Sequence, residues 1–347
     1  MRWTDDGYDP PNAARYVPAN RRTRPNYVPG ARRRGARGAL SGPAVTIYVE
    51  TLIQASIEDV WRYTQTPELH ARWDLRFTDI RYLPHSDPAA PLQFRYETRL
   101  GFGLRIQGEG ETVAAREDSS RVRTSSLRFW SDDPKSLIRV GSGYWQYIPT
   151  DDGVRFLTRY HYETRFGRLG QLFNARVFEP LLGWATAWSF DRLRLWLEHG
   201  VDPAAALDGS VVHALARFLL AAIWVYQGLV PKLLYPDTGE LEIIRRTRLF
   251  RGAESIALRV LACGEIAFGL ALLRLWRARS LLLLNALALV GLTAGAARST
   301  PALFRAPFNP ASLNLAMAGL SVIGYEASRN LPSAARCLRH PAPPPHA

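Results

Sequence analysis

Cysteine is nearly absent from this chain, and so are the common patterns of catalytic residues. Cys263 and Cys337 are the only cysteines among 347 residues, too few for a disulfide framework or a thiolate metal site. The seven histidines are scattered, and we find neither a Ser–His–Asp arrangement nor a glycine-rich phosphate loop. The sequence therefore predicts no catalytic residue, no metal and no cofactor.

Lysine is scarce too, so arginine carries nearly all of the formal net charge of +13. Arginines cluster in residues 1–43, where proline and glycine are frequent and no apolar period exists, which predicts a disordered tail. This basic arm is either a solvated tail or a loose contact for anionic lipids. No folded reader motif accompanies it, so we expect no nucleic-acid partner. No apolar stretch of a secretory signal follows the first charges.

Residues 44–165 alternate between apolar and polar side chains, as strands with one covered face do. Ser56 and Thr66-Pro67 interrupt this pattern as starts of two short helices. Gly101-Phe102-Gly103 and Asp151-Asp152-Gly153 are typical of hairpin turns. The predicted strands cover 45–53, 77–83, 92–100, 104–112, 121–129, 138–149 and 154–165.

A long helix is predicted over Leu169–His199, where apolar residues recur at helical spacing. Pro180 cannot donate a backbone hydrogen bond, so we expect a short lead-in helix, a kink, and a main helix from Leu181. A curved antiparallel sheet around this helix is an α+β helix-grip fold. The space between sheet and helix receives a set of aromatic side chains by strand and helix parity: Trp73, Phe94, Tyr96, Trp145, Tyr147, Tyr160, Tyr162, Trp184 and Trp188.

The opening of this region resembles a known superfamily. Residues 53–61 (IQASIEDVW), Pro67-Glu68 and Trp73 are similar to the start of START-like domains, also called SRPBCC or polyketide cyclase/dehydrase-like. The resemblance covers about 44–200 and implies a deep apolar cavity between sheet and helix. Because the superfamily includes lipid carriers, ligand sensors and cyclases, it implies a cavity and not a reaction.

Four apolar segments follow a predicted linker over 201–210. They cover 211–230, 256–275, 280–297 and 312–327, lengths that suit membrane spans, the last one being short. The sequence thus predicts an all-α bundle of four transmembrane helices over 211–328 and a disordered tail over 329–347.

This half resembles the DoxX-like membrane family. The similarity lies in Trp224, Gln227-Gly228, Pro231-Lys232, Gly264-Glu265, and Phe308-Asn309-Pro310 with Asn314. The resemblance to that family implies no established reaction.

Glu265 lies in the middle of the second apolar segment, where a carboxylate must pair with a cation, take up a proton or face the bundle. Arg217, Arg259 and Lys232 are its candidate partners. Pinning helices together and a role in transport or redox coupling remain equally open. Gln227 and Asn309 complete the predicted set of intramembrane polar residues, and Asn309 is expected to join helices or to cap one.

Together these patterns predict a membrane-anchored protein that binds a hydrophobic small molecule or lipid. The alternative is an enzyme or a redox accessory, either cyclase-like or part of a quinone-linked membrane oxidoreductase, and a structural membrane partner is a third reading. We expect a multi-pass protein of the cytoplasmic membrane with the START-like domain in the cytoplasm, because the chain shows no export signal. Arginines in the second loop between spans agree with this orientation, and those in the first loop oppose it. A homo-oligomer or a membrane partner stays open.

Overall fold

The computed structural model describes residues 45–84, 91–236, 239–305, 307 and 309–341. The chain divides into two compact units. Unit 1 consists of Met1–Ala204 with Pro332–Ala347, and unit 2 consists of Ala205–Leu331. The tail predicted over residues 1–43 lies outside the described residues.

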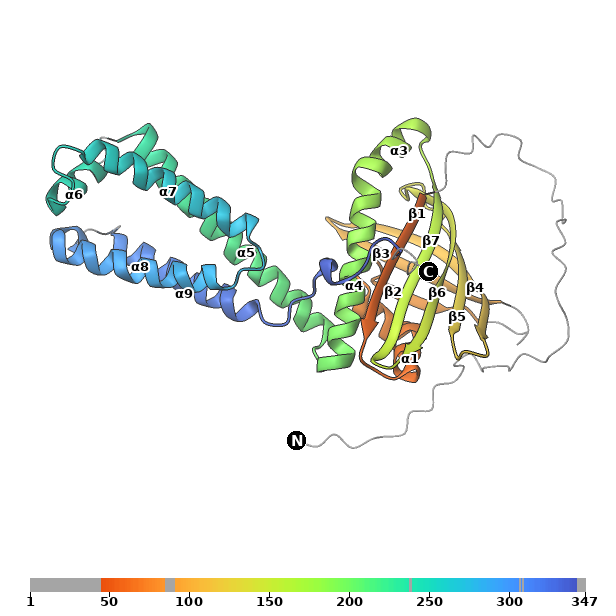
Figure 1. Ribbon diagram of the computed structural model, residues 1–347. Coiled ribbons are helices and arrows are strands. Elements are labelled where there is room, and N and C mark those ends of the chain that lie inside the picture. Colours follow the sequence, from red (N-terminus) through yellow and green to blue (C-terminus); the bar gives the residue numbers. More distant parts are fainter. Residues whose placement is uncertain (1–44, 85–90, 237–238, 306, 308, 342–347) are drawn as a thin grey trace, which may run out of the picture. The chain divides into compact units, whose positions relative to one another are not determined.

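Unit 1 is built on a curved antiparallel sheet of seven strands, which confirms the predicted helix-grip sheet (Figure 1). The strand order is β1-β7-β6-β5-β4-β3-β2, so β1 and β2 form the two edges. The bounds are β1 Val45–Ile53, β2 Asp79–Tyr82, β3 Leu92–Gly101, β4 Leu104–Glu117, β5 Arg123–Trp130, β6 Ile138–Thr150 and β7 Gly153–Thr164.

Two short helices stand between β1 and β2. Helix α1 covers Ile57–Gln65, and its N-cap Ser56 accepts a hydrogen bond from the Asp59 backbone N–H at 3.1 Å. Helix α2 covers Pro67–Trp73, with proline in the first turn, where no partner for a backbone N–H is needed. Both starts match the sequence prediction.

The long helix is interrupted where proline predicts a kink. Helix α3 covers Gly167–Phe173, a π-helical turn η1 covers Asn174–Phe178, and α4 runs over Glu179–His199. The π turn directly precedes Pro180, which has no backbone N–H to donate. Helix α4 packs against the sheet and ends at Gly200, whose φ of 65° suits glycine at a helix C-terminus.

The predicted linker and carboxy-terminal tail both differ from the structure. Helix α5 begins at Pro203, because Asp202 accepts the Ala204 N–H at 2.8 Å and the following alanines favour helix. Residues 332–341 return to unit 1. This segment forms the short helix η4 over Ala334–Arg336, buries Cys337 and exchanges two backbone hydrogen bonds of 2.9 Å between Leu338 and Glu50 of β1.

Unit 2 is helical, as predicted. Its elements are α5 Pro203–Gly228, η2 Leu229–Leu234, α6 Glu240–Thr247, α7 Glu254–Arg274, α8 Ser280–Ser299, η3 Pro301–Arg305 and α9 Pro310–Ala327. Within the described residues, three stretches are long and apolar enough to cross a membrane: Pro203–Leu234, Glu254–Arg274 and Ser280–Arg298. Helix α9 holds the fourth predicted segment but does not reach that hydropathy, because Asn314 and Glu326 lie within it.

Candidate functional sites

Most of the aromatic side chains that parity assigned to the interior of unit 1 are buried or half-buried. Trp73, Trp145, Tyr147, Tyr160, Tyr162 and Trp188 are buried, and Phe94 and Tyr96 are half-buried. Trp184 is 42% exposed, so its assignment is wrong. Gly183, Thr186 and Phe190 form the face of α4 toward the sheet, and residue 184 is rotated about 100° from residue 183.

One end of this interior is filled by its own rings. The centroids of Trp145 and Phe156 lie 5.8 Å apart, and those of Phe156 and Phe190 stack at 4.5 Å. Trp73 contacts both Trp145 and Phe190 at 6.2 and 6.1 Å. The deep cavity implied by the resemblance is therefore closed at this end.

Elsewhere on the sheet, three half-buried rings lie against glycines of the neighbouring strands. A Cβ at Gly108 would come within 2.2 Å of the Tyr96 ring, and one at Gly110 within 2.4 Å of Phe94. Likewise, a Cβ at Gly141 would come within 2.3 Å of the Phe129 ring. These glycines let β4 and β6 accept the rings, which are half-buried. We call Phe94, Tyr96 and Phe129 the aromatic wall.

A charged cluster that we did not predict lies beside these rings. His70 Nε2 is 3.0 Å from Asp74 Oδ2, and Arg76 donates to both Asp74 carboxylate oxygens from Nε (2.9 Å) and Nη2 (2.6 Å). Arg76 Nη1 is 3.4 Å from the hydroxyl of Tyr160, which lies 3.1 Å from Thr186 Oγ1. The one available signal was the i, i+4 spacing of His70 and Asp74 at the end of α2.

The charge states in this cluster follow from burial and pairing. Burial opposes ionisation of Asp74, but the Arg76 charge and hydrogen bonds from His70 and Arg76 outweigh it and hold the Asp74 pKa well below its usual range. Burial lowers the pKa of His70, and the hydrogen bond to Asp74 offsets this only in part. At neutral pH the cluster is an Asp74–Arg76 ion pair with a neutral imidazole. In this state Arg76 Nη1 can donate a hydrogen bond to an oxygen atom, whereas the second ring nitrogen of His70 is an acceptor.

In unit 2, Lys232 is the partner of Glu265 among the three candidates. Its Nζ lies 3.1 Å from Glu265 and 3.4 Å from Glu240, and it donates to the backbone carbonyl of Gln227 at 3.3 Å. A Cβ at Gly228 would come within 2.5 Å of the Ala262 carbonyl, so glycine lets α5 approach α7 here. Four positions of the DoxX-like resemblance, residues 227, 228, 232 and 265, thus meet at one place.

The two arginines proposed as partners of Glu265 lie elsewhere. Arg259 is exposed. Arg217 is wholly buried and donates to the carbonyls of Leu272 (2.6 Å) and Ala278 (2.8 Å), at and beyond the end of α7. The last carbonyls of a helix lack intrahelical partners, so Arg217 stabilises a helix end. Asn309 caps α9 as expected, because its side chain accepts the Ser312 N–H at 3.1 Å.

Across the residues that the structure describes, His, Cys, Asp and Glu nowhere gather in threes as metal ligands do.

Both units match known families. Residues 44–198 match "Polyketide cyclase / dehydrase and lipid transport", and residues 221–322 match the "DoxX-like family". A relative from Bacillus subtilis (strain 168), the uncharacterized membrane protein YndG, is 42% identical over 245 residues, covering 67% of this chain and 91% of YndG. The chain belongs to the polyketide cyclase/dehydrase and lipid-transport family, fused to a DoxX-like domain. Unit 1 is the cyclase-type domain, and unit 2 is the DoxX-like domain.

Solved structures resemble the cyclase-type domain at low identity. The di-domain ARO/CYC StfQ from the steffimycin biosynthetic pathway is 15% identical, with a TM-score of 0.36 over 44% of this chain and 50% of StfQ. A STAR-related lipid transfer protein fragment from Xanthomonas axonopodis is 16% identical, with a TM-score of 0.32 over 42% of this chain and 85% of the fragment. The protein TTHA0849 from Thermus thermophilus is 19% identical, with a TM-score of 0.30 over 40% of this chain and 86% of that protein.

Proposed function

We propose that this protein holds a hydrophobic small molecule or lipid in its cyclase-type domain while its DoxX-like domain anchors it in a membrane. The observation that carries the proposal is the aromatic wall beside the His70–Asp74–Arg76 cluster. Ligand sites combine a mostly apolar lining with a few fixed polar groups, and this arrangement offers both.

The polar end of such a ligand has a recognisable partner. The side chains of His70 and Arg76 are each 13% exposed, although Asp74 is completely covered. Arg76 is held by Asp74 through two hydrogen bonds, so its remaining Nη1 is presented in a fixed direction near the hydroxyl of Tyr160. A carbonyl, hydroxyl or carboxylate oxygen at one end of an apolar molecule fits these donors.

The membrane anchor favours binding of a hydrophobic ligand by the cyclase-type domain. A domain tethered to a bilayer meets a ligand dissolved in that bilayer at a high effective concentration, without any new contact. A hydrophobic ligand is concentrated in the same phase.

The connectivity favours an even number of membrane crossings. The chain leaves unit 1 at Ala204 and returns at Pro332, and the returning segment is fixed there because Ser333 donates to Asp191 at 2.7 Å and Leu338 pairs with Glu50. Both ends of the DoxX-like domain then lie on one side of the membrane. Together with the three apolar stretches, this supports α9 as the fourth span. We place unit 1 on the cytoplasmic side of the inner membrane.

Ligand binding can be tested on the full chain purified in lipid nanodiscs. Leu127 shares the inward face of β5 with Ser125 and Phe129, and its neighbour Arg128 points outward. Leu127→Trp adds a large ring beside the aromatic wall and should displace a ligand bound there, whereas Arg128→Trp adds the same ring on the other face. Mass spectrometry of extracted small molecules should find a compound that copurifies with the wild type and Arg128→Trp and is depleted with Leu127→Trp. Equal amounts in all three, or no compound, would contradict binding at this place.

A cyclase-like enzyme is the second candidate, because His70 is a neutral imidazole held by a carboxylate, as a general base requires. His70→Gln separates the two functions. A binder keeps the same copurifying compound in the variant. An enzyme accumulates a compound of different mass, the unconverted substrate.

A further inference from the structure

A continuous stripe of exposed apolar side chains runs along α3, η1 and the start of α4. Apart from the adjacent Leu172 and Phe173, its members follow one another at spacings of three to four residues, which place them on one broad side of the helix. The exposed fractions range from 79% at Leu169 to 42% at Trp184. The apolar stripe consists of Leu169, Leu172, Phe173, Val177, Leu181 and Trp184.

The stripe is unusual within its own helix. The second half of α4 is buried from Thr186 to Leu195, whereas the stripe lies on the part that includes α3, which Figure 1 shows near one end of the strands. Large apolar side chains gathered in one exposed patch, rather than scattered singly, mark an interaction surface.

The charges beside the stripe are positive. Arg168 and Arg176 are exposed on the same helical stretch, and Glu179 is the only acidic residue between Gly167 and Phe190. An apolar helix face flanked by arginines and closed by a tryptophan is the pattern of a helix that lies in a membrane interface.

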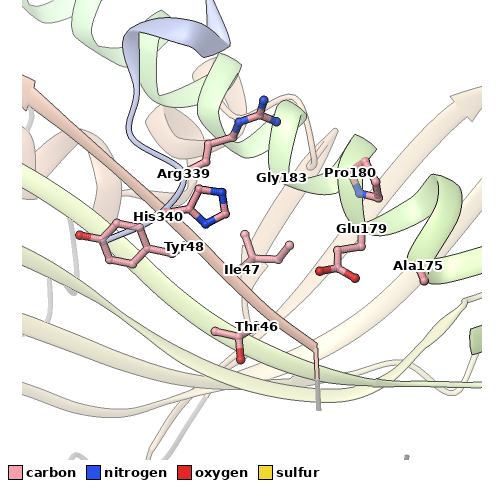
Figure 2. Close-up of a pocket in the computed structure, with 9 residues that line it drawn as sticks. All are labelled: Thr46, Ile47, Tyr48, Ala175, Glu179, Pro180, Gly183, Arg339 and His340. Carbon is pink, nitrogen blue, oxygen red and sulfur yellow. The ribbon is translucent and has the colours of Figure 1, made fainter. Parts of the chain in front are cut away.

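A groove beside the stripe adds an arginine and a histidine. It holds about 250 Å³ between β1 and the start of α4, where Glu179, Pro180 and Gly183 line it. Figure 2 shows Arg339 and His340, from the returning carboxy-terminal segment, on the same groove. A phosphate group at the membrane surface would meet these donors while its acyl chains meet the stripe.

We propose that the apolar stripe lies in the interface of a bilayer that contains anionic phospholipids. The occupant is lipid because the same chain carries helices that reach membrane length, so a bilayer is within covalent reach of unit 1. This surface goes beyond the proposed function, since it needs no ligand inside the domain. It gives the cyclase-type domain a defined face toward the lipid.

The test uses the full chain in nanodiscs of zwitterionic and anionic lipid. Cys263 is exposed and is replaced by Ser, while buried Cys337 stays. A fluorophore is then attached to Leu172→Cys or, as a control, to Arg128→Cys on the outward face of β5. Quenchers carried on lipid acyl chains should reduce emission at residue 172 at least threefold more than at residue 128. Equal quenching at both positions would overturn the proposal.

Two further measurements identify the alternatives. If unit 2 or a second copy of the chain covers the stripe, the residue 172 label will be shielded from aqueous and lipid quenchers alike, which contradicts a lipid contact. Arg168→Gln with Arg176→Gln should lower lipid quenching in anionic nanodiscs and leave it unchanged in zwitterionic ones. If the wild type carries no copurifying compound while quenching at residue 172 is as predicted, the proposed function is rejected and the lipid contact of the stripe is kept.

Discussion

In the cyclase-type domain Asp74 has one cation and one neutral imidazole as partners, whereas in the DoxX-like domain Lys232 is shared by the carboxylates of Glu240 and Glu265. The first cluster is balanced: one acid faces one base, and both carboxylate oxygens accept hydrogen bonds. The second carries a surplus negative charge when all three groups are ionised. The buried cluster of unit 1 is thus balanced in charge, whereas that of unit 2 has two acids for one base.

Removing the acid from the balanced cluster should have the largest effect. Asp74→Ala leaves the Arg76 guanidinium largely covered and unpaired, and we expect a loss of about 3–5 kcal/mol of unfolding free energy in unit 1. Asp79→Ala breaks an exposed pair with Arg81 and should cost less than about 1 kcal/mol. Denaturant unfolding followed by tryptophan fluorescence measures both, and equal losses would refute a special role for the buried pair.

The second prediction concerns a buried charge of unit 2, that of Arg217. Arg217→Gln removes the donors for carbonyls at the end of α7, and leaving such groups buried without partners costs about 1–3 kcal/mol each. The thermal midpoint of the full chain in nanodiscs should fall clearly. Exposed Arg259→Gln is the control and should leave the midpoint unchanged. A midpoint that survives Arg217→Gln would show that water or lipid can replace the guanidinium.

Two glycine substitutions compare the packing of unit 1 with that of unit 2. Gly141→Ala places a methyl group 2.3 Å from the Phe129 ring and should destabilise unit 1 by about 1–3 kcal/mol. Gly291 lies in α8, and a methyl group added there would have nothing within 4 Å, so Gly291→Ala should be neutral or stabilise by up to about 1 kcal/mol. Thermal unfolding of both variants checks this, and a stable Gly141→Ala would mean that the aromatic wall moves freely.

The smallest effect is a dependence of unit 1 stability on pH. The His70 pKa is lowered in the folded state, so near pH 6 the unfolded chain binds a proton that the folded chain does not. Stability should therefore fall as pH drops below about 6.5, and again below about 4, where the unfolded carboxyl of Asp74 takes up a proton. In His70→Gln the first decrease should vanish and the second remain. A first decrease that persists in the variant would assign it to another group.

Much of the fold was predicted from the periodicity of apolar residues. Alternation along Leu92–Leu100 and Val154–Arg165 predicted strands that the structure confirms, and Pro180 marked the interruption of the long helix. These features are local, because strand parity and proline geometry act within a few residues. Trp184 was misplaced because the face of a helix toward a sheet depends on the packed partner, which the sequence alone does not supply.

The charged cluster and the carboxy-terminal segment were missed for a different reason. His70, Asp74 and Arg76 carry no periodic signal, and their meeting with Tyr160 joins residues far apart in the chain. Leu338 pairs with Glu50 across most of the sequence length. The composition of this segment predicted a disordered tail. Backbone hydrogen bonds to an edge strand do not depend on residue type, so the sequence does not indicate them.

The most direct measurement is a cryo-electron microscopy map of the full chain in nanodiscs made from its native lipids. The account predicts elongated non-protein density against the rings of Phe94, Tyr96 and Phe129, with one end within hydrogen-bond distance of Arg76. A map in which these rings close on α4 with no density between them would contradict the claim that this domain holds a hydrophobic ligand.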